Sequence, residues 1–421
     1  MTFQPVELVA ACIFAAALVH TFSTKLFERL AHRLPRHAGL FHLLGEVEVV
    51  FGFWAIVLIL AMALLQGPSQ ALHYAETRNY TEPLFVFVVM VIAGSRPILH
   101  AVQAVIQLGA RLLPVEPQVA TAWLGLAVVP LLGSLVTEPA AMTIAALMLA
   151  PVVFRTEMPE PPKYLALGVL FVNVSIGGTL TSYAAPPVLM VATTWNWDSH
   201  FMLSTFGWKA AVAVLINATV AAAILRRKLI QHAPAGSRAE AGKPAVPGGI
   251  ILVHLALLAG VVMLAHHPVA FLGLFLLFLG FAQAYERHQD ALLIKEALLV
   301  AFFLAGLVVL GGMQSWWLQP VVSALQPLAL FFGALGLTAI TDNAALTYLG
   351  SQIEGISDAA KYMLVAGAVG GGGLTVIANA PNPAGLALLR RGFADESVGA
   401  GALFLGALAP TVVAAAAFLL L

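Results

Sequence analysis

The sequence predicts an all-α polytopic membrane protein. Of its 421 residues 61% are hydrophobic and only 10% are charged, against about 25% charged residues in an ordinary soluble domain. The mean hydropathy is +0.94, and apolar runs of about 20 residues, long enough to cross a bilayer, recur along the chain. The formal net charge is zero, without a basic domain, so nucleic acid is not an expected partner.

The apolar runs define the expected elements in chain order. Spans are expected near 6–24, 45–65, 83–104, 163–196, 205–226, 249–265, 269–285, 295–311, 362–389 and 399–420. Two further apolar stretches, 118–154 and 327–349, are interrupted by polar residues. The polar stretch 227–248 is the one evident linker. We expect an integral protein of a bacterial inner membrane, in contact with the lipid bilayer.

The distribution of Lys and Arg decides how the two interrupted stretches are read, because cytoplasmic loops collect these residues. We treat both stretches as re-entrant hairpins and start the chain outside. The cytoplasmic side then receives 16 of the 20 cations, and the outside only Arg78 and Lys361. A crossing span at either stretch would reverse every later loop. We therefore expect both termini outside and a cytoplasmic linker at 227–248.

This topology gives two halves of the same plan, residues 1–226 and 249–421. Each half has five transmembrane spans, one re-entrant hairpin and one broken helix. Five is an odd number, so the second half must be inverted relative to the first, as in many secondary transporters. Two sequence matches support the repeat: TEPAA at 137–141 with TDNAA at 341–345, and GGTLT at 177–181 with GGGLT at 371–375.

The hairpin interruptions carry the strongest functional signal. Glu138 and Asp342 occupy equivalent places, and a carboxylate within a membrane costs about 2.5–3.5 kcal/mol on insertion scales. Such an acid is retained with a partner, a water path or a bound cation. Hydroxyl and amide oxygens adjoin these acids in the sequence, and we expect an ion site at Thr137, Glu138, Thr341, Asp342 and Asn343. Two alternatives stay open: one acid is a relic of duplication, or both serve stability at helix ends.

The two broken spans supply further oxygens. Neither the GGTLTSYAAPP run at 177–187 nor the NAPNP run at 379–383 can form a smooth helix. Irregular backbone at membrane depth is tolerated where it lines a cavity or is buried in protein. We add Asn379 to the ion site, and consider an ion or proton path through Thr179, Thr181, Thr375, Asn382, Asn173 and Glu46. Glu46 could equally cap a helix near the interface. A carboxylate site of this kind suits Na⁺, and neither a transition metal nor a cofactor is expected.

These motifs resemble the ion transporter superfamily, and within it the sodium/proton antiporter family related to the NhaD type. The resemblance rests on LTAITDNAA at 337–345, LTVIANAPNPAG at 374–385, and the Thr137-Glu138-Pro139 and 177–181 runs. It implies a homodimer, ion binding between hairpin tips and broken helices, and elevator-like motion. Dicarboxylate symporters of the superfamily carry Ser-Asn-Thr at the hairpin tips. The acids found here instead would repel an anionic substrate and favour a cation as cargo.

The sequence therefore predicts a secondary antiporter that exchanges Na⁺, or another monovalent cation, for protons. The alternative is a Na⁺- or H⁺-coupled symporter for an organic or inorganic solute on the same scaffold. An enzyme is not expected, since neither a His-Glu-x-x-His nor a Walker A motif is present.

Overall fold

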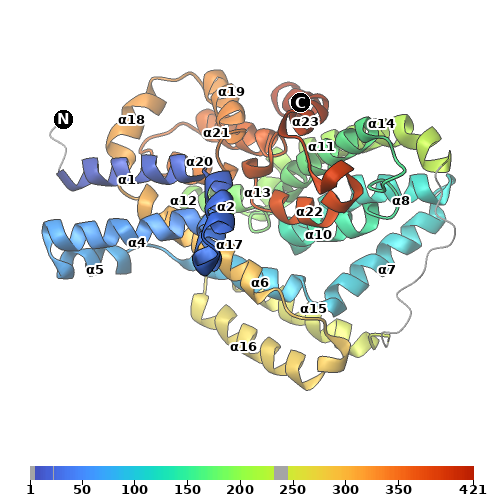
Figure 1. Cartoon of the computed structure of the whole chain (residues 1–421), viewed down its shortest axis with the longest axis horizontal. Helices are drawn as coiled ribbons and strands as arrows, with labels where there is room; N and C mark the ends of the chain where they lie inside the picture. Colours follow the sequence, from blue (N-terminus) through green and yellow to red (C-terminus); the bar gives the residue numbers. More distant parts are fainter. Residues whose placement is uncertain (1–4, 22, 232–244) are drawn as a thin grey trace.

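The chain is helical, as the sequence predicts. The computed structural model describes residues 5–21, 23–231 and 245–421, and these ranges contain helices but no strand (Figure 1). Residues 232–244, the greater part of the expected linker, lie outside the described ranges. The flanking helices are α14 (Trp208–Gln231), which continues past the expected boundary at 226, and α15 (Gly248–Met263).

Within the described ranges, five helical stretches are long and apolar enough to cross a membrane. They contain α4 (Val47–Gln66), α11 (Glu160–Gly177), α14, α17 (Ile294–Gly311) and α23 (Ala400–Leu420). A short 3₁₀ turn, η2 (Gly178–Leu180), extends α11. Two short elements precede α14: α13 (Ser199–Met202) and a π-helical turn, η3 (Leu203–Gly207).

Two bent helix pairs raise the number of candidate spans to as many as seven. The pair α6 (Thr81–Ala93) and α7 (Arg96–Leu112) is bent by 67°, and the pair α8 (Pro117–Leu126) and α9 (Val128–Val136) by 40°. The stretch expected as a span near 83–104 is therefore bent between Ala93 and Arg96. Ser95 is extended, with ψ 146°, and Pro97 lies in the first turn of α7, where a missing backbone N–H is tolerated.

The remaining elements are shorter. The apolar ones of 10–17 residues include α1 (Pro5–Thr21), α10 (Glu138–Leu149), α16 (Pro268–Ala284) and α19 (Pro327–Thr338). The other α-helices are α2 (Thr24–Arg33), α3 (Ala38–Gly45), α5 (Pro68–Glu76), α12 (Pro186–Trp195), α18 (Ser315–Ser323), α20 (Asn343–Ser351), α21 (Asp358–Gly371) and α22 (Asn382–Leu389). The 3₁₀ turns are η1 (Pro35–His37), η4 (Glu286–His288), η5 (Val376–Ala378), η6 (Arg390–Gly392) and η7 (Ala394–Glu396).

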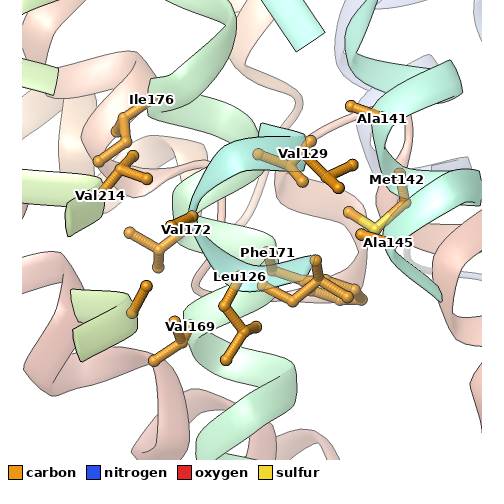
Figure 2. Close-up of a cluster of buried hydrophobic side chains, with 14 of the residues drawn as sticks. Leu126, Val129, Ala141, Met142, Ala145, Val169, Phe171, Val172, Ile176 and Val214 are labelled. Atoms are coloured by element: carbon orange, nitrogen blue, oxygen red, sulfur yellow. The ribbon is translucent and has the colours of Figure 1, made fainter. Parts of the chain in front are cut away.

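Two large apolar clusters form the interior. One involves α1, α4, α6, α16 and α17, and α1, α4 and α5 extend to one end of the molecule (Figure 1). The other joins α8, α10, α11, α14 and α23, and Figure 2 shows part of it around Leu126, Met142 and Phe171. Small residues allow close helix contact, as is common in membranes: a Cβ at Gly168 would lie 2.4 Å from the Gly406 carbonyl carbon.

The helix breaks that matter for function lie between these packed elements. The first is where α9 ends and α10 begins, with Thr137 as the N-cap and Pro139 in the first turn. The second lies between α19 and α20, with Asp342 as the N-cap. Two longer breaks separate η2 from α12 and α21 from α22. The elements cross over: α12 packs on α20, and α22 packs on α10.

Candidate functional site

Glu138 lies at the centre of the candidate site and is fully buried. Its backbone N–H donates to the carbonyl of Ala184 at 3.5 Å, in the break before α12. Its Oε2 accepts a hydrogen bond of 2.8 Å from Nδ2 of Asn379, in the break before α22. The two long breaks thus converge on one residue, the first at its backbone and the second at its carboxylate. A Cβ at Gly178 would lie 2.5 Å from Oε1 of Glu138, so glycine makes room for the acid.

Asp342 approaches the same point from the other short break. Its Oδ1 accepts from the backbone N–H groups of Ala344 and Ala345, at 2.8 and 3.2 Å, so it caps α20. A small cavity of about 20 Å³ is lined by Asp342 and Asn379 together with Val300 and Phe303 of α17. That volume accommodates one water-sized species.

Asn343 extends the site toward α11. It is fully buried, and its Nδ2 donates to Oγ of Ser175 at 3.4 Å, while Ser175 donates to the carbonyl of Val369 at 2.8 Å. A Cβ at Gly372 would lie 2.1 Å from Oγ of Ser175. Glycine at 372 is therefore required for this approach of the two halves.

The hydroxyl groups expected at the site mostly hold backbone in place. Thr137 Oγ1 accepts from the N–H of Ala140 at 3.4 Å, and Thr341 donates to Leu337 O at 2.9 Å on a half-exposed turn. In the longer breaks, each side chain donates to a carbonyl: Thr179 to Ile176 at 2.6 Å, Thr181 to Ser134 at 2.6 Å, Thr375 to Ala339 at 2.8 Å, and Asn382 to Gly372 and Thr375 at 2.8 and 3.0 Å.

Two residues considered for an ion or proton path have their contacts elsewhere. Asn173 donates to the carbonyls of Leu126 and Val214 and accepts from Asn217, so it joins α11 to α8 and α14. Glu46 lies before α4 and forms a half-exposed ion pair of 3.6 Å with Lys295. Neither residue shares a hydrogen bond with Glu138, Asp342 or Asn379 in the described part of the chain.

Several buried oxygens at the breaks lack a hydrogen-bond partner among the described residues. They are Glu138 Oε1, Thr338 Oγ1, Asn343 Oδ1, Asn379 Oδ1 and Asn382 Oδ1. Buried polar atoms are normally satisfied, and oxygen is the ligand atom that hard cations prefer.

Two hydroxyl residues at the breaks escaped sequence reasoning, Ser134 and Thr338. Ser134 donates to Gly177 O at 2.6 Å and accepts from the N–H of Leu180 at 2.9 Å. Each lies four residues before its acid, Glu138 or Asp342. Extending the repeat match by one helical turn would have found both.

Long apolar helices interrupted around buried carboxylate and amide groups define a membrane transporter. The family model described as "Putative Na+/H+ antiporter" matches residues 5–421. The chain belongs to this family, which confirms the resemblance read from the motifs, and it is an integral membrane protein.

The other comparisons add a distant similarity. No match was found among curated proteins. One similar solved structure is described as "Crystal structure of the Alcanivorax borkumensis YdaH transporter reveals an unusual topology". It is 13% identical, with a TM-score of 0.45, over 88% of this chain and 96% of the other.

Proposed function

We propose that the protein is a secondary antiporter that exchanges Na⁺ for H⁺ by alternating access. The observation that carries the proposal is the Glu138–Asn379 pair. Asn379 orients one oxygen of a fully buried carboxylate at 2.8 Å, and the other oxygen, Oε1, has no partner in the described residues. A carboxylate in this setting is stable when it holds either a proton or a cation. Binding of one therefore excludes the other, which couples the two fluxes.

We assign the ion to Glu138, Asp342, Asn343 and Asn379, with Thr137 and Thr341 shaping the hairpin tips. Asp342 and Asn379 line the same cavity, and Asn379 contacts Glu138, so a cation or proton at this point would relieve repulsion between the two acids. The cavity beside Asp342 and Asn379 measures about 20 Å³. This size favours an ion over an organic solute, and so favours the antiporter over the symporter.

We further propose that the chain consists of two inverted repeats, 1–226 and 249–421, joined by a cytoplasmic linker at 227–248. The crossed packing supports this: the second broken-span helix of each half, α12 or α22, packs on α20 or α10 of the other half. In this scheme α8–α10 and α19–α20 are the re-entrant hairpins. Lys and Arg counts support termini outside, in a bacterial inner membrane. A homodimer with elevator-like motion follows from the family resemblance.

The test is Na⁺-dependent proton flux in proteoliposomes, followed by quenching of a pH-sensitive dye. Glu138→Gln is expected to abolish the flux, and Asp342→Asn to abolish it or to reduce it strongly. Glu116→Gln is the matched control, because Glu116 pairs with Arg226 at the exposed end of α14, and it should transport normally. Full flux in both Glu138→Gln and Asp342→Asn would refute antiport at this site.

A further inference from the structure

A second, larger cavity lies beside the first broken span. It has a volume of about 580 Å³, on the side of the protein predicted to face outward. The lining includes Ser182 and Tyr183 of the break, Thr193 near the end of α12, Asp198 before α13, and His266 after α15. Apolar side chains, including Leu189, Val262 and Met263, complete the wall.

The floor of this cavity reaches the backbone that contacts Glu138. Tyr183 lines the cavity, and the next residue, Ala184, accepts the hydrogen bond from the N–H of Glu138. The half-buried Tyr183 ring meets the edge of the Phe85 ring at a centroid distance of 6.5 Å. Tyr183 therefore both lines the cavity and adjoins the residue that contacts Glu138.

One carboxylate, that of Asp198, lies among the side chains that line the cavity. Asp198 is exposed in the lining, and its Oδ1 accepts from the N–H of Phe201 at 2.7 Å. Glu82 of α6 is buried outside this lining, and its Oε1 accepts from Nδ2 of Asn79 at 3.3 Å. A carboxylate in a cleft raises the local concentration of cations.

We propose that this cavity is the outer vestibule through which hydrated Na⁺ reaches Glu138. Asp198 attracts the cation, and Tyr183 separates the vestibule from the binding site. The proposal rests on the proposed function for the identity of the ion. The cavity and its charge are properties that can be measured without transport.

The experiment uses the single native cysteine of the chain. Cys12 is exposed on α1, so Cys12→Ser provides a background without reactive thiols. Thr193→Cys places a thiol in the vestibule. Ser323→Cys, on the exposed end of α18, is the matched control on the same predicted side. Each variant is treated in right-side-out vesicles with membrane-impermeant methanethiosulfonates, one carrying a trimethylammonium group and the other a sulfonate.

Thr193→Cys is expected to react from outside. The ratio of its reaction rate with the cationic reagent to that with the anionic reagent should be about 10-fold larger than the same ratio for Ser323→Cys. Adding Asp198→Asn, which keeps an oxygen to cap α13, should shrink this preference. Labelling should block Na⁺-dependent proton flux in Thr193→Cys and leave it intact in Ser323→Cys.

Three results would each refute the vestibule: Thr193→Cys does not react, the reagent preference is equal at the two positions, or full flux remains after Thr193→Cys is labelled. The preference is measured without transport. If the unlabelled background shows no Na⁺-dependent flux, the proposed function fails, and the reagent preference still decides whether the vestibule exists.

Discussion

Replacing Asn379 by alanine removes the one side chain that donates a hydrogen bond to Glu138 among the described residues. Both groups are fully buried, and their atoms are 2.8 Å apart. In Asn379→Ala, neither oxygen of Glu138 is held in place. The same change also removes Oδ1 of Asn379, one of the partnerless oxygens at the breaks. We therefore expect the variant to fold but to bind Na⁺ weakly.

The size of the effect follows from the kind of bond. A hydrogen bond to a charged group contributes about 1.5–3 kcal/mol. Loss of that amount from the Na⁺-bound state corresponds to roughly 10- to 150-fold weaker binding. The ionised carboxylate loses more stabilisation than the protonated one when the amide is removed, because only the ionised form has the full charge that the amide stabilises. Na⁺ affinity should accordingly fall, whereas proton affinity should rise.

The assay is the Na⁺ concentration needed for half-maximal proton flux, combined with the Na⁺ concentration that protects the purified protein against thermal unfolding. Asn217→Ala is the matched control, since Asn217 is also a buried amide and donates to Asn173 and Pro410 at 3.0 and 3.2 Å. It should lower thermal stability without changing the Na⁺ dependence. Unchanged Na⁺ dependence in Asn379→Ala would refute the role assigned to the pair.

Two glycine substitutions test the packing. Gly178→Ala puts a methyl group 2.5 Å from Oε1 of Glu138 and should abolish the protection by Na⁺ against thermal unfolding. Gly370→Ala is the control, because its Cβ would meet its nearest neighbour at 3.8 Å, and it should keep that protection. Equal protection in the two variants would contradict the geometry. Gly168→Leu should push α11 from α23 and destabilise the protein by about 1–3 kcal/mol, seen as a lower unfolding temperature in detergent. Gly401→Leu, with nothing within 4 Å, should have little effect, and matching temperatures would argue against close packing.

The sequence predicted the helical class and the breaks because both depend on local chemistry. Proline, glycine and capping residues end helices wherever they occur, so the interruptions at Thr137 and Asp342 could be located from their neighbours. The bend between α6 and α7 has a similar local cause, but the surrounding hydropathy concealed it.

The partners of buried polar groups could not be predicted in the same way. Asn379 lies 241 residues from Glu138 along the chain, and only the packing of α22 on α10 brings them together. Asn173 shows the converse. Its position before a helix break suggested an ion path, whereas its contacts join α11 to α8 and α14. Residue type and spacing do not distinguish these two roles, since a buried amide satisfies its hydrogen bonds in either place.

The central claim is that Na⁺ and a proton exclude each other at Glu138. Its most direct test is the release of protons when Na⁺ is added to the purified protein in weakly buffered solution. We expect Na⁺ to release protons from the unaltered protein, and K⁺ or choline at equal ionic strength to release few. Adding Na⁺ to Glu138→Gln should release no protons. Release that persists undiminished in Glu138→Gln, or Na⁺ binding without any proton release, would contradict the account.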